Sequence, residues 1–120
     1  MNQKSNLPIN LDQLHQISEG DIEFEIEVLQ VYVEDVLQRI EIIRQAIANN
    51  DHTQIMKEAH HVKGSSSNVG ALQMRDLAVQ LEDLNLDQEL AKAPNILEDM
   101  LVKMQAVEDF IAEKSANLPS

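Results

Sequence analysis

The longest uninterrupted pattern in the sequence lies between Gly20 and Asn49, and it constrains the fold more than any other feature. Apolar residues recur there at spacings of three and four, as they do along one face of an α-helix. They are Phe24, Ile26, Val28, Leu29, Val31, Tyr32, Val36, Leu37, Ile40, Ile43, Ala46 and Ile47. No glycine or proline interrupts the run. The sequence therefore predicts one helix of about seven turns over residues 22–48.

A second helix begins after Asp51, which forms a capping-box pattern with Gln54. Its apolar stripe alternates steps of four and three. The stripe consists of Ile55, Ala59, Val62, Ser66 and Val69. The end of this helix has two alternatives. Helix propensity alone ends it at Lys63, because glycine, serine and asparagine follow. The continuing stripe and the stop signal at Gly70 favour an end at Val69.

Two more helices follow the turn at Gly70. Residues 71–84 repeat the helical period, and a loose connection with a turn of helix at 87–92 comes next. Asn95 and Glu98 have the form of a second capping box, so we expect the last helix to begin at Asn95 and to end near Lys114.

A short helix precedes the long one. Asn10 is a suitable N-cap, Leu11, Leu14 and Ile17 share one face, and Gly20 ends the segment. Four principal helices with short connections pack as an antiparallel bundle. The predicted fold is therefore all-α, an antiparallel four-helix bundle with an additional short N-terminal helix.

The composition agrees with one helical domain. The chain has 120 residues, enough for a single core, and no cysteine, which excludes disulfides and thiolate metal sites. Hydrophobic residues make up 43% but aromatic residues only 2%, and aliphatic side chains are typical of helix packing. We expect a flexible tail over 1–9, the helical bundle over 10–115 and a C-terminal tail over 116–120.

The charge restricts the partners. Nine basic residues against 21 acidic ones give a net charge of −12, which repels nucleic acid and anionic lipid. No apolar run is long enough to span a bilayer, and the first residues lack the apolar segment of a signal peptide. We therefore expect a cytoplasmic protein whose partners are proteins or cations.

One face of the helix that begins near residue 52 carries the candidate chemistry. Beside its apolar stripe lie Met56, His60, Lys63, Gly64 and Ser67, three and four residues apart. Imidazole is partly neutral near pH 7 and is then a nucleophile. A lysine one turn away offers a cation for phosphoryl oxygens, and a glycine lets another protein approach closely. This face predicts that His60 handles a phosphoryl group.

The hairpin about Gly70 brings a second group to His60. Residues at similar distances on either side of the turn lie at the same level, and Gln80, Glu82 and Asp83 meet this condition. A carboxylate or amide among them would bond one ring nitrogen and leave the other nucleophilic. Glu82 is the favoured candidate because it adjoins an inward-facing leucine.

The other histidines provide alternatives. His61 is the rival acceptor, but it lies about 100° around the helix and has no lysine three residues on. His15 and His52 are interpreted as surface residues without a task. Glu58 and His61 form a Glu-x-x-His pair, as in di-iron bundles, yet no second copy exists, so we expect no metal site.

The segment Ala59–Ser66, with Gly70-Ala71 and the stretch Leu77–Glu82, closely resembles the histidine-containing phosphotransfer domains, called HPt, of phosphorelays. The resemblance implies that His60 is phosphorylated, that Lys63 and Gly64 support it, and that Glu82 bonds to it. It also implies a helix that continues past Gly64.

The same resemblance implies a phosphocarrier and not an autonomous enzyme. His60 would accept a phosphoryl group from the aspartate of a receiver domain, as in a hybrid sensor histidine kinase, and pass it to a response regulator. The partner receiver would hold Mg²⁺, whereas this chain would need no cofactor. We expect a monomer, because one histidine suffices for this task. A kinase would need a glycine-rich phosphate loop and magnesium ligands, which three scattered glycines do not provide.

The expected docking surface surrounds His60 and includes Met56, Gly64 and Ser67, with Leu11, Leu14 or Ile17 of the first helix as contributors. The alternative function is an acidic helical module that binds a partner through this face without accepting phosphate.

Overall fold

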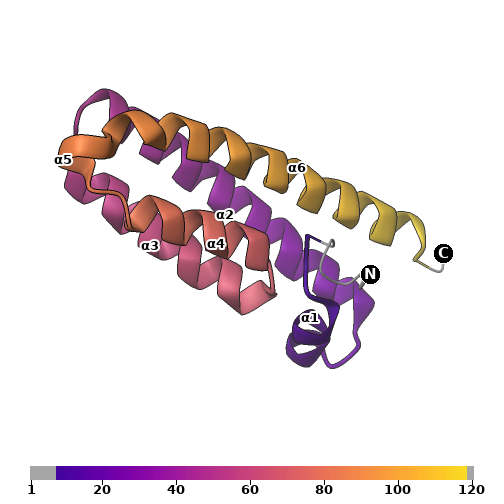
Figure 1. Cartoon of the computed structure of the whole chain (residues 1–120). Helices are drawn as coiled ribbons and strands as arrows, with labels where there is room; N and C mark the ends of the chain where they lie inside the picture. Colours follow the sequence, from indigo (N-terminus) through magenta and orange to yellow (C-terminus); the bar gives the residue numbers. More distant parts are fainter. Residues whose placement is uncertain (1–7, 119–120) are drawn as a thin grey trace, which may run out of the picture.

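The computed structural model of the chain describes residues 8–118. Within them all regular elements are helical, as predicted. The elements are α1 (Leu11–Ser18), α2 (Ile22–Ala48), α3 (His52–Val69), α4 (Leu72–Glu82), α5 (Leu86–Glu89), the 3₁₀ helix η2 (Leu90–Lys92) and α6 (Ala93–Ala116). Figure 1 shows α2, α3, α4 and α6 side by side as an antiparallel bundle, with α1 across one end. Neighbouring helices pack in the order α2, α3, α4, α6 and back to α2.

The long helix α2 has the predicted boundaries. The side chain of Asp21 accepts a hydrogen bond from the amide of Phe24, which satisfies one of the free N–H groups at the helix start. Its buried residues recur every three or four positions and face α3 and α6, from Leu29 to Ala46. The helix ends where Asn50 adopts a left-handed conformation with φ 54°.

Helix α3 continues to Val69, so the alternative that ends it at Lys63 is wrong. Burial of Val62, Ser66 and Val69 outweighs the low helix propensity of the serines. The hydroxyl of Ser66 forms a buried hydrogen bond of 2.6 Å with Tyr32 on α2. Asp51 caps the helix as predicted, but the Gln54 side chain donates to Glu58 and does not reach back.

Gly70 ends α3 and is tied to α1. Its φ is 81°, and its carbonyl accepts a 2.7 Å hydrogen bond from the amide of Asn10. A Cβ atom here would lie 3.0 Å from the Asn10 carbonyl oxygen. Glycine is therefore required for both conformation and space.

Gly70→Ala is expected to lower the free energy of unfolding by about 1–3 kcal/mol, because the substitution combines backbone strain with a clash. Urea denaturation measures this loss. Gly20→Ala is the matched control, since Gly20 has φ 88° but open space around it. Equal losses in the two variants would contradict the importance of the contact between Gly70 and Asn10.

Two helix boundaries differ from the sequence prediction. Helix α6 begins at Ala93 with Pro94 in its first turn and no side-chain cap, so the prediction that Asn95 caps it is wrong. Proline suits the first helical turn, where its missing N–H has no partner anyway, and η2 leads directly into the helix. Helix α4 ends at Glu82, two residues before the predicted limit.

The packed core extends to the ends of the described part of the chain. Ile9 is completely buried, and Leu118 packs against the core. Of the predicted tails, residues 1–7 and 119–120 lie outside the described residues, whereas Ile9 and Leu118 belong to the packed part of the molecule. None of the helices within residues 8–118 has the length and apolar composition that a membrane span requires.

Candidate functional site

His60 projects from the outward face of α3. Ala59 and Val62 of the neighbouring core stripe are completely buried, so this stripe fixes the rotation of α3 about its axis. The side chain of His60 is 71% exposed. The ring is therefore open to a partner molecule.

Glu82 connects His60 to Lys63. One carboxylate oxygen lies 3.2 Å from Nδ1 of His60, and the other lies 2.9 Å from Nζ of Lys63. The predicted contact between His60 and Glu82 is present, whereas Gln80 and Asp83 line another hollow with Ile96 of α6. The hairpin α3–α4 thus assembles the imidazole, the ammonium and the carboxylate at one level of the bundle.

The charge of Glu82 determines which ring nitrogen of His60 carries the proton. Partial burial raises the pKa of Glu82, but hydrogen bonds from Lys63 and His60 and their charges outweigh burial, so the net pKa is lowered. An ionised carboxylate only accepts hydrogen bonds, so Nδ1 of His60 carries the proton. Among the described residues none bonds to Nε2, which keeps its lone pair in the neutral ring.

Glu82 predicts a pH dependence of stability. Because its pKa is lowered in the folded state, its contribution is present above about pH 4.5 and is lost as the pH falls through the folded pKa. The excess in unfolding free energy of the wild type over Glu82→Gln is expected to shrink as the pH falls below about 4.5.

Urea denaturation at several pH values measures this difference, which we expect to stay below about 1 kcal/mol because the group is partly exposed. Asp83→Asn, at the exposed neighbouring position, is the control. A difference between wild type and Glu82→Gln that does not change with pH would contradict the charged pairing.

The predicted docking residues separate into accessible and inaccessible ones. Gly64 is exposed, and a Cβ atom there would meet nothing within 4 Å. Met56, Ser67 and Leu11 are partly exposed. Leu14 is completely buried, so its assignment to the docking surface is wrong: this face of α1 fills the core.

Ile17 of α1 is 39% exposed and remains available to a partner. The accessible residues therefore lie on α3 around His60 and on the outer side of α1.

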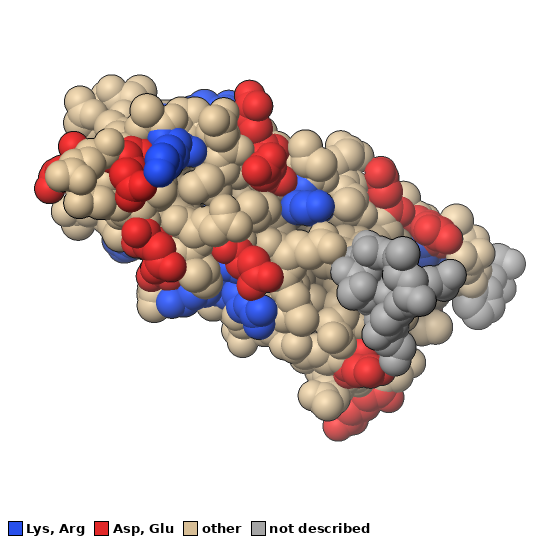
Figure 2. All heavy atoms as spheres, viewed as in Figure 1, with Lys and Arg blue, Asp and Glu red and all other residues tan. Residues whose placement is uncertain are grey.

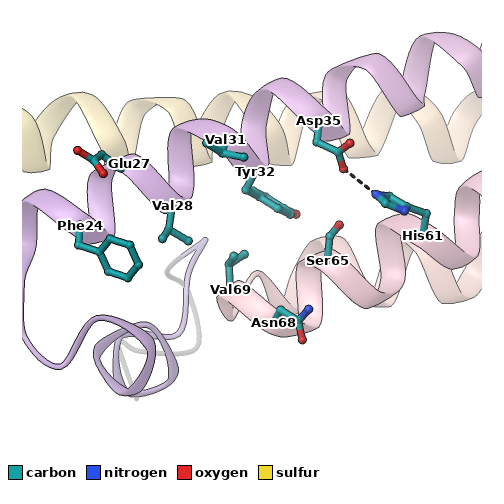
Figure 3. A pocket seen from close by; sticks show the side chains of 10 residues that line it. All are labelled: Phe24, Glu27, Val28, Val31, Tyr32, Asp35, His61, Ser65, Asn68 and Val69. Carbon is teal, nitrogen blue, oxygen red and sulfur yellow. Dashed lines mark hydrogen bonds and ion pairs between the residues drawn. The ribbon is translucent and has the colours of Figure 1, made fainter.

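His61 has different surroundings from His60. Its Nε2 lies 2.8 Å from Asp35 on α2, and Asp35 also accepts a hydrogen bond from Arg39. Figure 3 shows the His61 ring at the edge of an apolar groove between α2 and α3, directed at Asp35. The ammonium of Lys63 binds Glu82 on α4 and so serves His60. The geometry therefore places Lys63 with His60 and not with His61, as the spacing of the three residues predicted.

The Glu-x-x-His pair that the sequence contains is not arranged for a metal. Glu58 is nearly buried and bonds to Arg39 and Gln54. Within residues 8–118, no group of three histidine, aspartate and glutamate side chains is placed to hold a metal ion.

Sequence reasoning missed the role of His15. It was interpreted as a surface residue without a task, but its Nδ1 lies 2.7 Å from the carboxylate of Glu25, which is completely buried. The spacing of Glu25 to Leu29, Tyr32 and Val36 places it in phase with the buried stripe of α2. An acidic residue at a position that the helical spacing buries was the feature of the sequence that could have predicted this contact. His52 has a longer contact of 3.5 Å with the exposed Asp87.

Figure 2 shows acidic and basic side chains beside one another on the face in view, with acidic groups also at the end of the bundle near α1. On this face the acidic side chains are spread over the surface and do not gather in one patch.

Comparisons with known proteins assign the chain to a family. The Hpt domain family model matches residues 27–114. A phosphorelay intermediate protein, rdeA of Dictyostelium discoideum, is 26% identical over 106 residues, which are 88% of this chain and 42% of the relative. The chain therefore spans about two fifths of the length of this curated relative.

Two solved structures have the same fold. The histidine-containing phosphotransfer protein B (HptB) of Pseudomonas aeruginosa PAO1 superposes with a TM-score of 0.82 at 23% identity, over 93% of this chain and 97% of that one. The HPT domain of a sensor hybrid histidine kinase from Shewanella gives 0.71 at 18% identity, over 94% and 97%. Because the family model covers more than half of the sequence, the chain belongs to the Hpt domain family.

Proposed function

We propose that this chain carries a phosphoryl group on Nε2 of His60. It takes the group from the aspartyl phosphate of a receiver domain, such as that of a hybrid sensor histidine kinase, and passes it to a response regulator. The observation that carries the proposal is the arrangement at His60: a 71% exposed ring whose Nδ1 contacts Glu82 and whose Nε2 makes no hydrogen bond within the described residues.

The chemical step follows from this arrangement. The Nε2 lone pair attacks the phosphorus, and the N–P bond forms as the P–O bond to the aspartate breaks. The aspartate carboxylate leaves with the electron pair. The proton on Nδ1 stays against Glu82, which balances the positive charge that the ring acquires. Onward transfer is the same step in reverse toward a second aspartate.

Lys63 supplies the cation for the phosphoryl oxygens. Its ammonium lies on the His60 side of α3 and is held by Glu82 in the unmodified protein. A lysine is a flexible point charge, so its side chain can turn from the carboxylate to a phosphoryl group without moving α3. The pair of Lys63 and Glu82 therefore keeps a cation near the reacting atom.

The partner supplies the remaining chemistry. Phosphoryl transfer needs Mg²⁺ and an acidic pocket, and we assign both to the receiver domain. The chain itself acts as a monomeric phosphocarrier in the cytoplasm, with its catalysis shared with the partner. Gly64, one turn from His60, leaves room for the receiver to bring its aspartate to the ring.

Incubation with a phosphorylated receiver domain tests the proposal. We expect the chain to gain a label that is stable in base and lost in acid, which tandem mass spectrometry locates at His60. A chain that binds receivers in a pull-down but is never labelled by any of them would instead be a non-phosphorylated interaction module.

A further inference from the structure

Three helices meet at one buried carboxylate that the proposed reaction does not use. Glu25, in the first turn of α2, is completely buried. From α1, the Ser18 hydroxyl donates to its Oε2 at 2.5 Å, and Nδ1 of His15 lies 2.7 Å from the same oxygen. From α6, Nζ of Lys114 lies 3.0 Å from Oε1.

This cluster holds α1 in place, because α1 is too short to be a stable helix by itself. A helix of eight residues is unstable alone in water, so α1 depends on its contacts with the bundle. Those contacts include the buried side chain of Leu14 and the contacts of His15 and Ser18 with Glu25. A completely buried charge is tolerated only when its partners surround it. Loss of the carboxylate charge therefore removes the attraction that draws His15, Ser18 and Lys114 to this position.

The position of α1 matters to the face around His60. The amide of Asn10 donates to the carbonyl of Gly70, and the Gln13 side chain donates to the carbonyl of Ser67. Ser67 lies seven residues after His60 on the same face of α3. Helix α1 is therefore bonded to the C-terminal end of the face that carries the candidate acceptor.

The same end of α3 borders the groove of about 560 Å³ that Figure 3 displays between α2 and α3. The ribbon of α1 passes below Phe24 and Val28 in that view. Leu11 is partly exposed and Ile17 is exposed, so α1 presents apolar side chains to solvent while it is hydrogen-bonded to this end of α3.

We propose that Glu25 is a positioning residue: it fixes α1 against the end of α3, so that α1 forms part of the surface that meets the partner of His60. Without the charge of Glu25, α1 leaves the bundle while the four long helices remain packed. The part of this proposal that concerns transfer rests on the proposed function of His60, and the part that concerns α1 does not.

Hydrogen exchange of the free chain tests the structural part. In Glu25→Gln, amides of α1 are expected to exchange about tenfold faster or more, because the local opening that exposes them becomes easier, while amides in the middle of α3 and α6 keep their protection. Glu23→Gln is the matched control, since it removes the same charge from an exposed position in the same helical turn. Unchanged α1 exchange in Glu25→Gln overturns the proposal.

Phosphotransfer tests the functional part. We expect transfer from a phosphorylated receiver to Glu25→Gln to be about tenfold slower than to wild type, with labelling of His60 by phosphoramidate unchanged, because a small donor needs no docking surface. Faster α1 exchange with unchanged receiver transfer overturns the role of α1 in docking.

Two further outcomes are separated by the same design. If Glu25→Gln fails to fold, Ser18→Ala removes the hydroxyl that donates to Glu25, together with its contacts to the His15 carbonyl and the Gly20 amide, and keeps every charge; it must then show the faster α1 exchange. If neither donor labels the wild type, the proposed function of His60 fails, whereas the exchange measurement still decides whether Glu25 holds α1.

Discussion

His60→Gln is expected to abolish phosphoryl acceptance from every receiver domain that labels the wild type. Glutamine preserves polarity and much of the volume but has no nucleophilic nitrogen, because its amide lone pair is delocalised. The exposed side chain contributes little to the core, so the variant is expected to fold. The measurement is incorporation of radiolabelled phosphate, together with circular dichroism to verify the helices.

His61→Gln is the matched control, one residue away on the same helix. We expect it to keep transfer within about threefold of wild type and to lose less than about 1 kcal/mol of stability, because it gives up only a partly exposed contact with Asp35. Labelling that survives His60→Gln and disappears in His61→Gln would show that His61 is the acceptor and would contradict the assignment of His60.

Gly64→Gln is expected to separate stability from transfer. The added side chain projects into open space one turn from His60, so it does not disturb the bundle. Replacing a glycine inside a helix by glutamine is worth roughly 0.5–1 kcal/mol of stability. The same side chain obstructs the approach of a receiver, and misplacement of reacting atoms by about 1 Å costs on the order of a hundredfold in rate. The variant should therefore unfold at higher urea concentration and transfer more slowly.

Ala112→Gln provides the control for this variant, since it adds a comparable side chain at an exposed position of α6. We expect it to leave the transfer rate unchanged. Normal transfer by Gly64→Gln would contradict close approach at Gly64 and move the docking surface elsewhere.

The sequence predicted those features that depend on one helix or one hairpin. The boundaries of α2 follow from an unbroken apolar period, and the continuation of α3 follows from a stripe that still reaches Val69. The choice of Glu82 needed only the turn at Gly70 and the rise per residue of two antiparallel helices. Local geometry of this kind is contained in residue spacing.

Features that depend on how separate helices pack against one another could not be predicted from the sequence. Glu25 is buried because His15 and Lys114 reach it from two other helices, and no spacing within α2 contains those partners. Leu14 was expected to face a partner because it shares a helix face with Leu11, but the packing of α1 on the bundle buries it. A charged residue whose helical spacing places it among buried apolar residues, such as Glu25, therefore indicates a contact between helices that the apolar pattern does not predict.

The buried hydrogen bond between Tyr32 and Ser66 gives the molecule an internal optical reporter. Tyr32 is the only tyrosine, and the chain has no tryptophan, so near-ultraviolet absorbance and emission come chiefly from one ring between α2 and α3. The pKa of Tyr32 is raised to about 12, chiefly by burial, while the hydrogen bond with Ser66 lowers it and the charge of Asp35 raises it. The phenol therefore favours the folded state below about pH 10 and loses this effect as the pH rises toward 12, so tyrosinate absorbance reports opening of the α2–α3 seam.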